Sequence, residues 1–276
     1  LRVRPGGGGG PQARGHSGAA VTADALARAL PGWEIRYYPR IDSTNAAAMR
    51  WLEAEAPQQP ALVCAQEQTA GRGRFSRRWE TPAAGAVALS LILRVSDAGR
   101  IPMAAGVATV EAVERLTSAR AGLKWPNDVE LDERKIAGIL VERARSNGLE
   151  YHILGIGINV SVDFTAVGGN LARRAGSICD FRAPGGAPVD LVDLVSGVGR
   201  GVQAALSDPQ LHNRWKRRLT TLGRRVTVGG SGGEVAGVAT DVDTDGCLLV
   251  VDDAGRTHRV SAGDVTVLKS GFSGDR

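Results

Sequence analysis

Cysteine and histidine are scarce in this chain of 276 residues. The three cysteines, Cys64, Cys179 and Cys247, lie far apart and form no CxxC pair. This argues against a disulfide framework or a cysteine-based zinc site and is typical of a reducing compartment. The four histidines are equally scattered, so the sequence indicates neither a metal cluster nor a His-based catalytic triad. We therefore expect no dedicated protein site for a metal.

Long apolar segments are also missing. No apolar run reaches the roughly 18 to 20 residues that a membrane span needs, and the first thirty residues lack the apolar core of a secretion signal. The glycine run at residues 6–10 is typical of a flexible linker, so residues 1–20 are expected to form a flexible tail. These features predict a cytoplasmic protein that does not bind membranes.

Lysine is the third scarce residue, because most basic side chains are arginine. Only four lysines occur, and two lie close together in the sequence, Lys124 in KWPND at residues 124–128 and Lys135 in KIAGILVE at residues 135–142. Lysine presents a compact point charge that arginine does not reproduce. A chemical role for these two lysines is therefore plausible, although Lys135 alone could be an ordinary lysine at a strand edge.

What the chain does contain is an arginine-rich glycine loop, GRGRFSRRW at residues 71–79. Glycines let the backbone approach a ligand closely, and guanidinium groups pair with phosphates and carboxylates in a bidentate manner. The loop is therefore a candidate anion site, and the alternative is a solvated surface loop. The net charge of +5 and the pI near 9.5 do not by themselves indicate nucleic-acid binding, because no RNP, zinc-finger or KH pattern occurs.

The loop does not match the common nucleotide motifs. The chain has no GxxxxGK[ST] and no GxGxxG that opens a helix after a strand, so arginines and loop amides would have to hold a nucleotide. No GxSxG elbow indicates a nucleophilic hydrolase.

The hydrophobic pattern predicts alternating helices and strands up to about residue 220, followed by short strands only. We predict helices over residues 21–30, 44–56, 103–118, 189–206 and 209–219, and strands over 34–38, 60–67, 86–93, 123–125, 135–143 and 150–160. Beyond Arg225, short strands separated by Gly and Asp turns predict a small all-β barrel of about fifty residues. The predicted units are a catalytic domain at 21–220 and a barrel at 221–270.

Five motifs in this order resemble the biotin–protein ligases: DSTN at 42–45, QTAGRGR at 68–74, KWPND, KIAGILVE, and GIGINV at 155–160. The resemblance covers roughly residues 35–268. It implies an α+β fold, with a mixed-sheet catalytic domain of the class II aminoacyl-tRNA synthetase/biotin ligase type and a C-terminal SH3-like barrel. Ser76 stands where the family usually has a glycine, which should stiffen the loop.

The resemblance implies a two-step reaction that uses biotin, ATP and Mg²⁺. Biotin carboxylate attacks the α-phosphate of ATP to give biotinyl-5′-AMP and pyrophosphate. A lysine of a biotin carboxyl carrier domain, part of a biotin-dependent carboxylase, then attacks the mixed anhydride and releases AMP. The first step brings two anions together and therefore requires cations.

Residue by residue, the resemblance assigns Ser43, Thr44 and Gln68 to the ureido end of biotin, and Lys135 to the carboxylate and phosphate. Arg72, Gly73 and Arg74 close over the adenylate, with Lys135, Arg72 and Arg74 as the catalytic cations, and Asn159 contacts adenine. Asn45 and Gly138 are further candidates for ligand binding. Weaker candidates are Trp79, Lys124, Asn127, Asp128, Gly155 and Gly157.

Several of these residues could instead have purely structural roles. Ser43 could be only a helix cap, Trp79 and Trp125 could be core aromatics, and the two glycines could serve strand packing. Alternative functions are a lipoate or octanoate ligase on the same scaffold, a biotin-responsive DNA-binding repressor, and a non-catalytic biotin-binding module. Relatives of the lipoate type lack the GRGR loop and KWPND. A repressor carries a winged helix of about sixty residues, whereas 41 residues precede Asp42 here, so we expect the short form without specific DNA binding.

Overall fold

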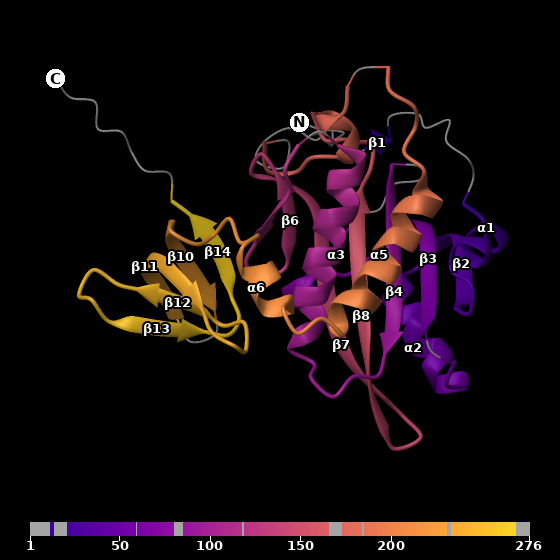
Figure 1. Cartoon of the computed structure of the whole chain (residues 1–276), viewed down its shortest axis with the longest axis horizontal. Helices are drawn as coiled ribbons and strands as arrows, with labels where there is room; N and C mark the ends of the chain where they lie inside the picture. The colour runs from indigo at the N-terminus through magenta and orange to yellow at the C-terminus, as the bar shows by residue number, and fades with distance from the viewer. Residues whose placement is uncertain are drawn as a thin grey trace, which may run out of the picture.

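The computed structural model describes residues 12–13, 21–58, 60–79, 85–117, 119–165, 173–183, 185–230 and 233–268. Two separate sheets organise them (Figure 1). A seven-stranded mixed sheet carries most of the helices, and a five-stranded antiparallel sheet follows at the C-terminal end. The fold is therefore α+β. Within the described residues, no helix combines the length and the apolar character that crossing a membrane requires.

The large sheet has the strand order β2-β3-β4-β8-β7-β6-β5. β2 and β3 are parallel, and every other neighbouring pair is antiparallel. Its strands are β2 (Glu34–Ile41), β3 (Ala61–Gln68), β4 (Ala86–Leu93), β5 (Gly122–Lys124), β6 (Asp128–Leu131), β7 (Arg134–Ser146) and β8 (Leu149–Asn159).

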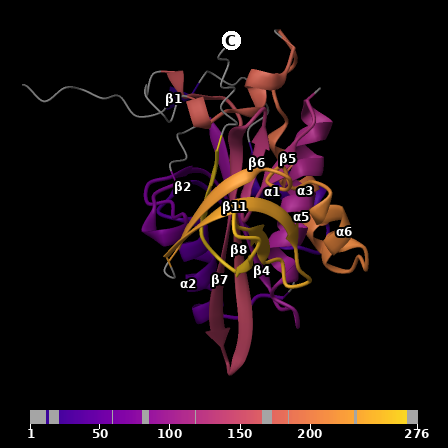
Figure 2. The ribbon, with the colours of Figure 1, turned by 90° about the vertical axis from the view of Figure 1, so that its left-hand side faces the viewer.

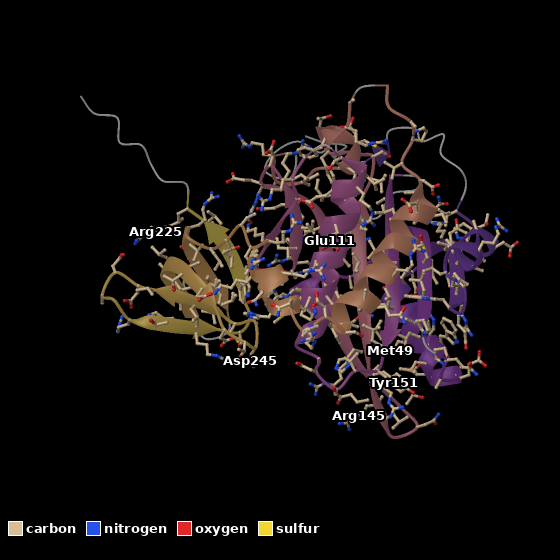
Figure 3. The ribbon with its side chains drawn as sticks, viewed as in Figure 1. Met49, Glu111, Arg145, Tyr151, Arg225 and Asp245 are labelled. Atoms are coloured by element: carbon tan, nitrogen blue, oxygen red, sulfur yellow. The ribbon has the colours of Figure 1, made fainter. Side chains whose placement is uncertain are left out.

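Helices cover the two faces of this sheet unequally. The larger core lies on the face covered by α1 (Ala23–Ala29), α3 (Arg100–Leu116) and α5 (Leu191–Leu206); α3 and α5 lie in front of the sheet in Figure 1. A smaller core on the other face joins α2 (Thr44–Ala54) to the strands. Tyr151 and Met49 belong to this smaller core, and Figure 3 shows both near the hairpin β7–β8.

Local sequence signals explain where these elements begin and end. Thr22 accepts a hydrogen bond from Ala25 N and starts α1, and Ser43 does the same for α2. The hairpin β7–β8 turns at Asn147 and Gly148, whose φ angles are 50° and 74°. Asn and Gly adopt this left-handed conformation more readily than other residues.

The small sheet has the order β13-β12-β11-β10-β14. Its strands are β10 (Arg225–Gly230), β11 (Gly233–Val242), β12 (Leu248–Val251), β13 (Thr257–Val260) and β14 (Asp264–Val267). Figure 2 shows this sheet facing the viewer, beside the β5–β6 end of the large sheet. Trp125 links the two parts, because its Nε1 donates to Gly246 O at 2.9 Å and its backbone N to Thr221 Oγ1 at 2.9 Å.

Most expected elements are confirmed, with shifts of a few residues at their ends. α2 ends at Ala54 rather than residue 56, α3 begins at Arg100 rather than 103, and α6 (Leu211–Lys216) is shorter than expected. Pro102 does not prevent the earlier start of α3, because proline is tolerated in the first helical turn.

Three short strands were not expected. β6 follows directly after KWPN, where the sequence indicated only a strand end at Pro126. Gln12–Ala13 (β1), inside the expected tail, pairs with β9 (Val162–Asp163). Most of the expected tail, residues 1–11 and 14–20 with the glycine run, lies outside the described residues.

Candidate active site

A cavity of about 440 Å³ opens on the α2 face of the large sheet. The N-terminus of α2, the arginine loop, strands β4 to β8 and β14 surround it. All the site residues that the sequence predicted, except Asn159, line this cavity: Ser43, Thr44, Asn45, Gln68, Arg72, Gly73, Arg74, Trp79, Lys124, Asn127, Asp128, Lys135, Gly138, Gly155 and Gly157.

The floor of the cavity is a single cross-strand row. Ala88 on β4 pairs with Gly157 on β8, Gly157 with Gly138 on β7, Gly138 with Asp128 on β6, and Asp128 with Lys124 on β5. Neighbouring strands lie about 4.8 Å apart, so the row runs about 19 Å across the sheet. Its first three residues are small and the last two are charged.

The small residues allow an aromatic ring to lie on the sheet. A Cβ atom added to Gly157 would overlap Nε1 of Trp79, and one added to Gly138 would lie 3.0 Å from its Cζ3 atom. Trp79 Nε1 is buried and has no hydrogen-bond partner among the described residues. A flat, apolar layer therefore forms over the glycines, and this supports the wall interpretation of Trp79.

A neutral polar network closes one end of the cavity. Thr44 donates its backbone N–H and its Oγ1 hydroxyl to Gln68 Oε1, at 2.7 and 3.1 Å. Ser90 Oγ lies 2.8 Å from Thr44 Oγ1 and 2.6 Å from Asn45 Oδ1. Because Ser43, Thr44, Asn45 and Ser90 are all buried, this end suits an uncharged ligand group that both donates and accepts hydrogen bonds.

The sequence reasoning missed two members of this region, Ser90 and Glu142. Glu142 Oε2 accepts from Asn45 Nδ2 at 2.7 Å and from Arg72 Nη2 at 3.2 Å, so it connects the polar network to the loop. Strand periodicity could have identified both, because Ser90 and Glu142 point to the same face as Ala88 and Gly138.

Positive charge gathers at the other end. Lys135 Nζ lies 2.6 Å from Asp128 Oδ1 and 5.3 Å from the Trp79 ring centroid. Lys124 is largely enclosed, and burial lowers its pKa. Burial raises the pKa of Glu130, which also accepts a hydrogen bond from Thr220 Oγ1 at 2.6 Å. Arg174, which no motif predicted, lines the same end.

The arginine loop is attached to several parts of the molecule. Arg74 Nη1 donates to Asn127 Oδ1 at 3.2 Å and to Gly263 O at 3.3 Å, and Arg77 forms an ion pair with Asp264. Burial lowers the pKa of Arg74. Phe75 has a φ of 54°, is 58% exposed, and carries the guanidinium of Arg74 above its ring. The small sheet therefore contributes directly to the position of the loop.

Asn159 and Trp125 make mainly structural contacts. Asn159 is not among the cavity residues, and its Nδ2 donates to Gly176 O at 3.1 Å and to Lys135 O at 3.4 Å. It therefore holds the backbone beside Lys135. Trp125 is 2% exposed and lies in the main core, although part of it borders the cavity. Among the described residues, no three His, Cys, Asp or Glu side chains group as metal ligands.

Comparison with known proteins identifies a class of protein ligase. Residues 37–159 match the model of the Biotin/lipoate A/B protein ligase family, and residues 221–268 match the Biotin protein ligase C terminal domain. The biotin protein ligase from Aquifex aeolicus, solved in complex with biotin and ATP, has a TM-score of 0.72 at 24% identity, covering 86% of this chain and 99% of that chain.

Curated relatives narrow the class. The biotin–[acetyl-CoA-carboxylase] ligase of Mycobacterium tuberculosis is 36% identical over 261 residues, which cover 89% of this chain and 94% of that protein. The bifunctional ligase/repressor BirA of Bacillus subtilis is 28% identical, covering 81% of this chain and 71% of that protein. The chain belongs to the biotin protein ligase family, as the five motifs predicted.

Proposed function

We propose that the chain is an ATP-dependent ligase that converts biotin to biotinyl-5′-AMP and transfers it to a lysine of a biotin carboxyl carrier domain. One observation supports the proposal: the glycine floor lies between a neutral polar end at Thr44, Gln68 and Ser90 and a charged end at Lys124, Asp128 and Lys135. Biotin has a neutral ureido group at one end and a carboxylate at the other, and the cavity offers complementary groups in the same order.

At the neutral end, Thr44 and Gln68 hold the ureido group. Ser43 and Asn45 stand beside them at the start of α2. Hydrogen bonds from Ser90 to Thr44 and Asn45 fix the orientation of these groups. Such pre-organisation lowers the entropic cost of binding. Gly155 and Gly157 leave space for the Asn45 amide and the Trp79 ring to lie against the sheet, and the rings of biotin lie against Trp79.

At the cationic end, Lys135 brings the two anions of the first step together. It offsets the repulsion between the biotin carboxylate and the α-phosphate while the carboxylate oxygen attacks phosphorus. Its partner Asp128 fixes the ammonium at 2.6 Å. Asn159, bonded to the Lys135 carbonyl, acts through this backbone as a positioning residue.

Arg72 and Arg74 keep the adenylate enclosed until the carrier lysine arrives. Arg72 reaches Glu142 from one side of the cavity, and Arg74 reaches Asn127 and Gly263 from the other. Loss of either arginine would open a route for water, which hydrolyses mixed anhydrides. Mg²⁺ arrives as part of the Mg–ATP substrate, because phosphate oxygens are its usual ligands in such sites.

The finer features of the fold are also proposals. The catalytic unit at residues 21–220 is of the class II aminoacyl-tRNA synthetase/biotin ligase type, and residues 221–270 form an SH3-like barrel. The contacts of Gly263 and Asp264 with the arginine loop support a role for the barrel in closing the ATP site. The proposed location is cytoplasmic, where carboxylase carrier domains are made.

The test is transfer of radiolabelled biotin to an apo carrier domain in the presence of Mg–ATP. We expect label on wild-type carrier and none on a carrier whose acceptor lysine is replaced by arginine. Labelled lipoate and octanoate, each supplied in place of biotin, should not be transferred to the carrier. A promoter DNA fragment added to the assay should not reduce the transfer of biotin. Transfer of lipoate or octanoate in place of biotin would refute the proposal.

A further inference from the structure

A chain of hydrogen bonds runs from the neutral end of the cavity towards the arginine loop. Gln68 Oε1, at the end of β3, accepts from Thr44, and Thr44 Oγ1 lies 2.8 Å from Ser90 Oγ on β4. Ser90 Oγ also lies 2.6 Å from Asn45 Oδ1, so the chain reaches the first turn of α2. The next link is the carboxylate of Glu142 on β7, which accepts from Asn45 Nδ2 at 2.7 Å.

Glu142 completes this chain, because the oxygen that accepts from Asn45 also accepts from Arg72 Nη2 at 3.2 Å. Arg72 follows Gln68 by four residues in the sequence. The hydrogen bonds therefore leave the backbone just before the arginine loop and return to it inside the loop. They close a ring through Glu142, and loss of its carboxylate would disconnect the loop from the neutral end of the cavity.

Glu142 is placed to act through its two partners rather than on a ligand. It lies on β7 opposite Ile153 of β8, and its side chain shares the α2 face with Gly138, because alternate residues of a strand point the same way. The side chain is 24% exposed, and Glu142 is not among the residues that line the cavity. Its effect on a ligand must therefore pass through Asn45 or Arg72.

The Asn45 amide has neighbours on both sides that determine which way it faces. Its Oδ1 lies against Gly155, where an added Cβ atom would come within 2.3 Å, and it meets the hydroxyl of Ser90. An ionised carboxylate only accepts hydrogen bonds, so Glu142 selects the orientation in which the amide nitrogen faces it. Glu142→Gln would retain an acceptor for this bond, because a glutamine amide has its own carbonyl oxygen.

The position of the Arg72 guanidinium depends more strongly on Glu142. The Arg72 side chain is 47% exposed, and within the described residues Glu142 is its one acidic partner. A backbone bridge to Arg78 fixes the main chain of Arg72 but not its long side chain. A hydrogen bond between ionised groups is stronger than a neutral one. The carboxylate of Glu142 therefore decides where this guanidinium lies.

We propose that Glu142 is a positioning residue that holds Arg72 over the cavity and so keeps biotinyl-5′-AMP enclosed between the two half-reactions. The proposal rests on the proposed function and gives a role to the last residue of KIAGILVE, for which the sequence gave no expectation. Glu142 touches neither biotin nor the adenylate. Its carboxylate sets the place of the arginine that does.

Two variants separate the contact with Arg72 from a general effect of charge. Glu142→Gln keeps the shape of the side chain and an acceptor for Asn45, but removes the charge that pairs with Arg72. Glu150→Gln is the matched control, because Glu150 lies on the same β7–β8 hairpin, pairs with Arg143 at 3.7 Å and does not line the cavity. Each variant removes one negative charge from this hairpin.

The first measurement is the rate at which radiolabelled synthetic biotinyl-5′-AMP dissociates when unlabelled adenylate is added in excess. For Glu142→Gln we expect a rate about three- to tenfold above wild type, since a half-exposed ionic hydrogen bond contributes less than a buried one. The dissociation constant of biotin alone, measured by calorimetry, should stay within about twofold of wild type. Glu150→Gln should match wild type in both measurements, and circular dichroism checks the fold of each variant.

A double-mutant cycle shows whether Glu142 acts through Arg72. Arg72→Ala should itself speed the dissociation of the adenylate. Adding Glu142→Gln to Arg72→Ala should give no further increase, because the contact has already been lost. Two residues that act independently would multiply their effects instead.

Four results would overturn the inference. An unchanged dissociation rate for Glu142→Gln would mean that the carboxylate does not hold the loop, and the same increase for Glu150→Gln would indicate a general effect of charge. An equal increase with and without Arg72 would mean that Glu142 acts elsewhere. A loss of biotin affinity as large as the increase in rate would place its effect at Asn45. Failure of the proposed function gives a different pattern, since wild-type protein would then form no biotinyl-5′-AMP from biotin and Mg–ATP.

Discussion

The two faces of the large sheet are built from the same strands but serve different purposes. On β8, Leu154, Ile156 and Ile158 point into the main core, where each is at most 1% exposed. The residues between them, Gly155 and Gly157, point to the α2 face and border the cavity. One face therefore maximises apolar burial, and the other leaves out side chains so that Asn45 and Trp79, which line the cavity, can lie against the backbone.

This contrast also separates stability from function along one strand. Alternate residues of a strand point to opposite faces, so neighbouring positions should respond differently to substitution. Changes on the α2 face should alter ligand affinity and rate with little effect on folding. Changes on the core face should alter the free energy of unfolding and leave the affinity of the folded protein unchanged.

The largest expected effect is at the charged end of the cavity, on the α2 face of the sheet. Lys135→Ala should slow biotinyl-adenylate formation about 100- to 1,000-fold, the usual cost of losing a group that stabilises developing charge. Biotin-dependent pyrophosphate release measures the effect, and circular dichroism checks the fold. Lys216→Ala is the control, because Lys216 pairs with Asp241 at 2.6 Å and is absent from the cavity lining. Near-normal pyrophosphate release by Lys135→Ala would remove Lys135 from the mechanism.

The next effect is at the glycine floor. Gly157→Ala places a methyl group where Trp79 lies, so the ring must move into the cavity. Returning the ring to its place when biotin binds costs about 1 to 3 kcal/mol of overpacking, which should raise the dissociation constant of biotin, measured by calorimetry, about 5- to 150-fold. The free protein avoids that overpacking by moving the ring, so its thermal stability should change little. Unchanged affinity would mean that the Trp79 ring does not contact biotin.

The matched substitution on the core face is Ile158→Ala, because Ile158 is fully buried in the main core and is not among the residues that line the cavity. It should lower the free energy of unfolding by about 2 to 5 kcal/mol, because it leaves a cavity in a packed core. Urea denaturation measures the loss, and calorimetry on the folded variant should give the wild-type biotin affinity. A large loss of affinity without a loss of stability would contradict the division between the faces.

The smallest expected effect concerns the pH dependence of stability at Asp42, just before the start of α2. Hydrogen bonds from Arg50 are the main cause that lowers the pKa of Asp42, to about 2. A carboxylate with a lowered pKa stabilises the folded state above its unfolded pKa of about 3.9. That stabilisation is lost as the pH falls through 2.

Wild type should therefore exceed Asp42→Asn in stability by under about 1 kcal/mol at neutral pH, since the pair is exposed. The difference should vanish between about pH 4 and pH 2 in denaturation curves collected across that range. A difference that is independent of pH would show that the charge of Asp42 is not the cause.

Much of this architecture could be predicted from the sequence. The hydrophobic pattern identified β4, β7 and β8 among the strands and α1 and α2 among the helices. The motifs brought together residues as far apart as Ser43 and Gly157 around one cavity. Local patterns are sufficient for the helices and strands because each depends on a few neighbouring residues, whereas the shared site was implied by the family resemblance that the five motifs carry.

Features that depend on contacts between distant segments could not be predicted. Nothing local marks Arg174 as a cavity residue, because a bridge between Ala175 and Lys135 sets its position. Asn159 belongs to a recognised motif, but nothing local in that motif indicates that its Nδ2 donates to Gly176 O. The attachment of the arginine loop to Gly263 and Asp264 depends on how the two sheets pack together, which no single motif encodes.

The most direct test of the central claim is the product that stays bound after the first step. Wild-type protein is incubated with biotin and Mg–ATP without a carrier, separated from free ligands, and examined by mass spectrometry. The account predicts one equivalent of biotinyl-5′-AMP per chain and an equal amount of released pyrophosphate. Release of ADP and phosphate, or an adenylate formed from lipoate or octanoate and not from biotin, would contradict it.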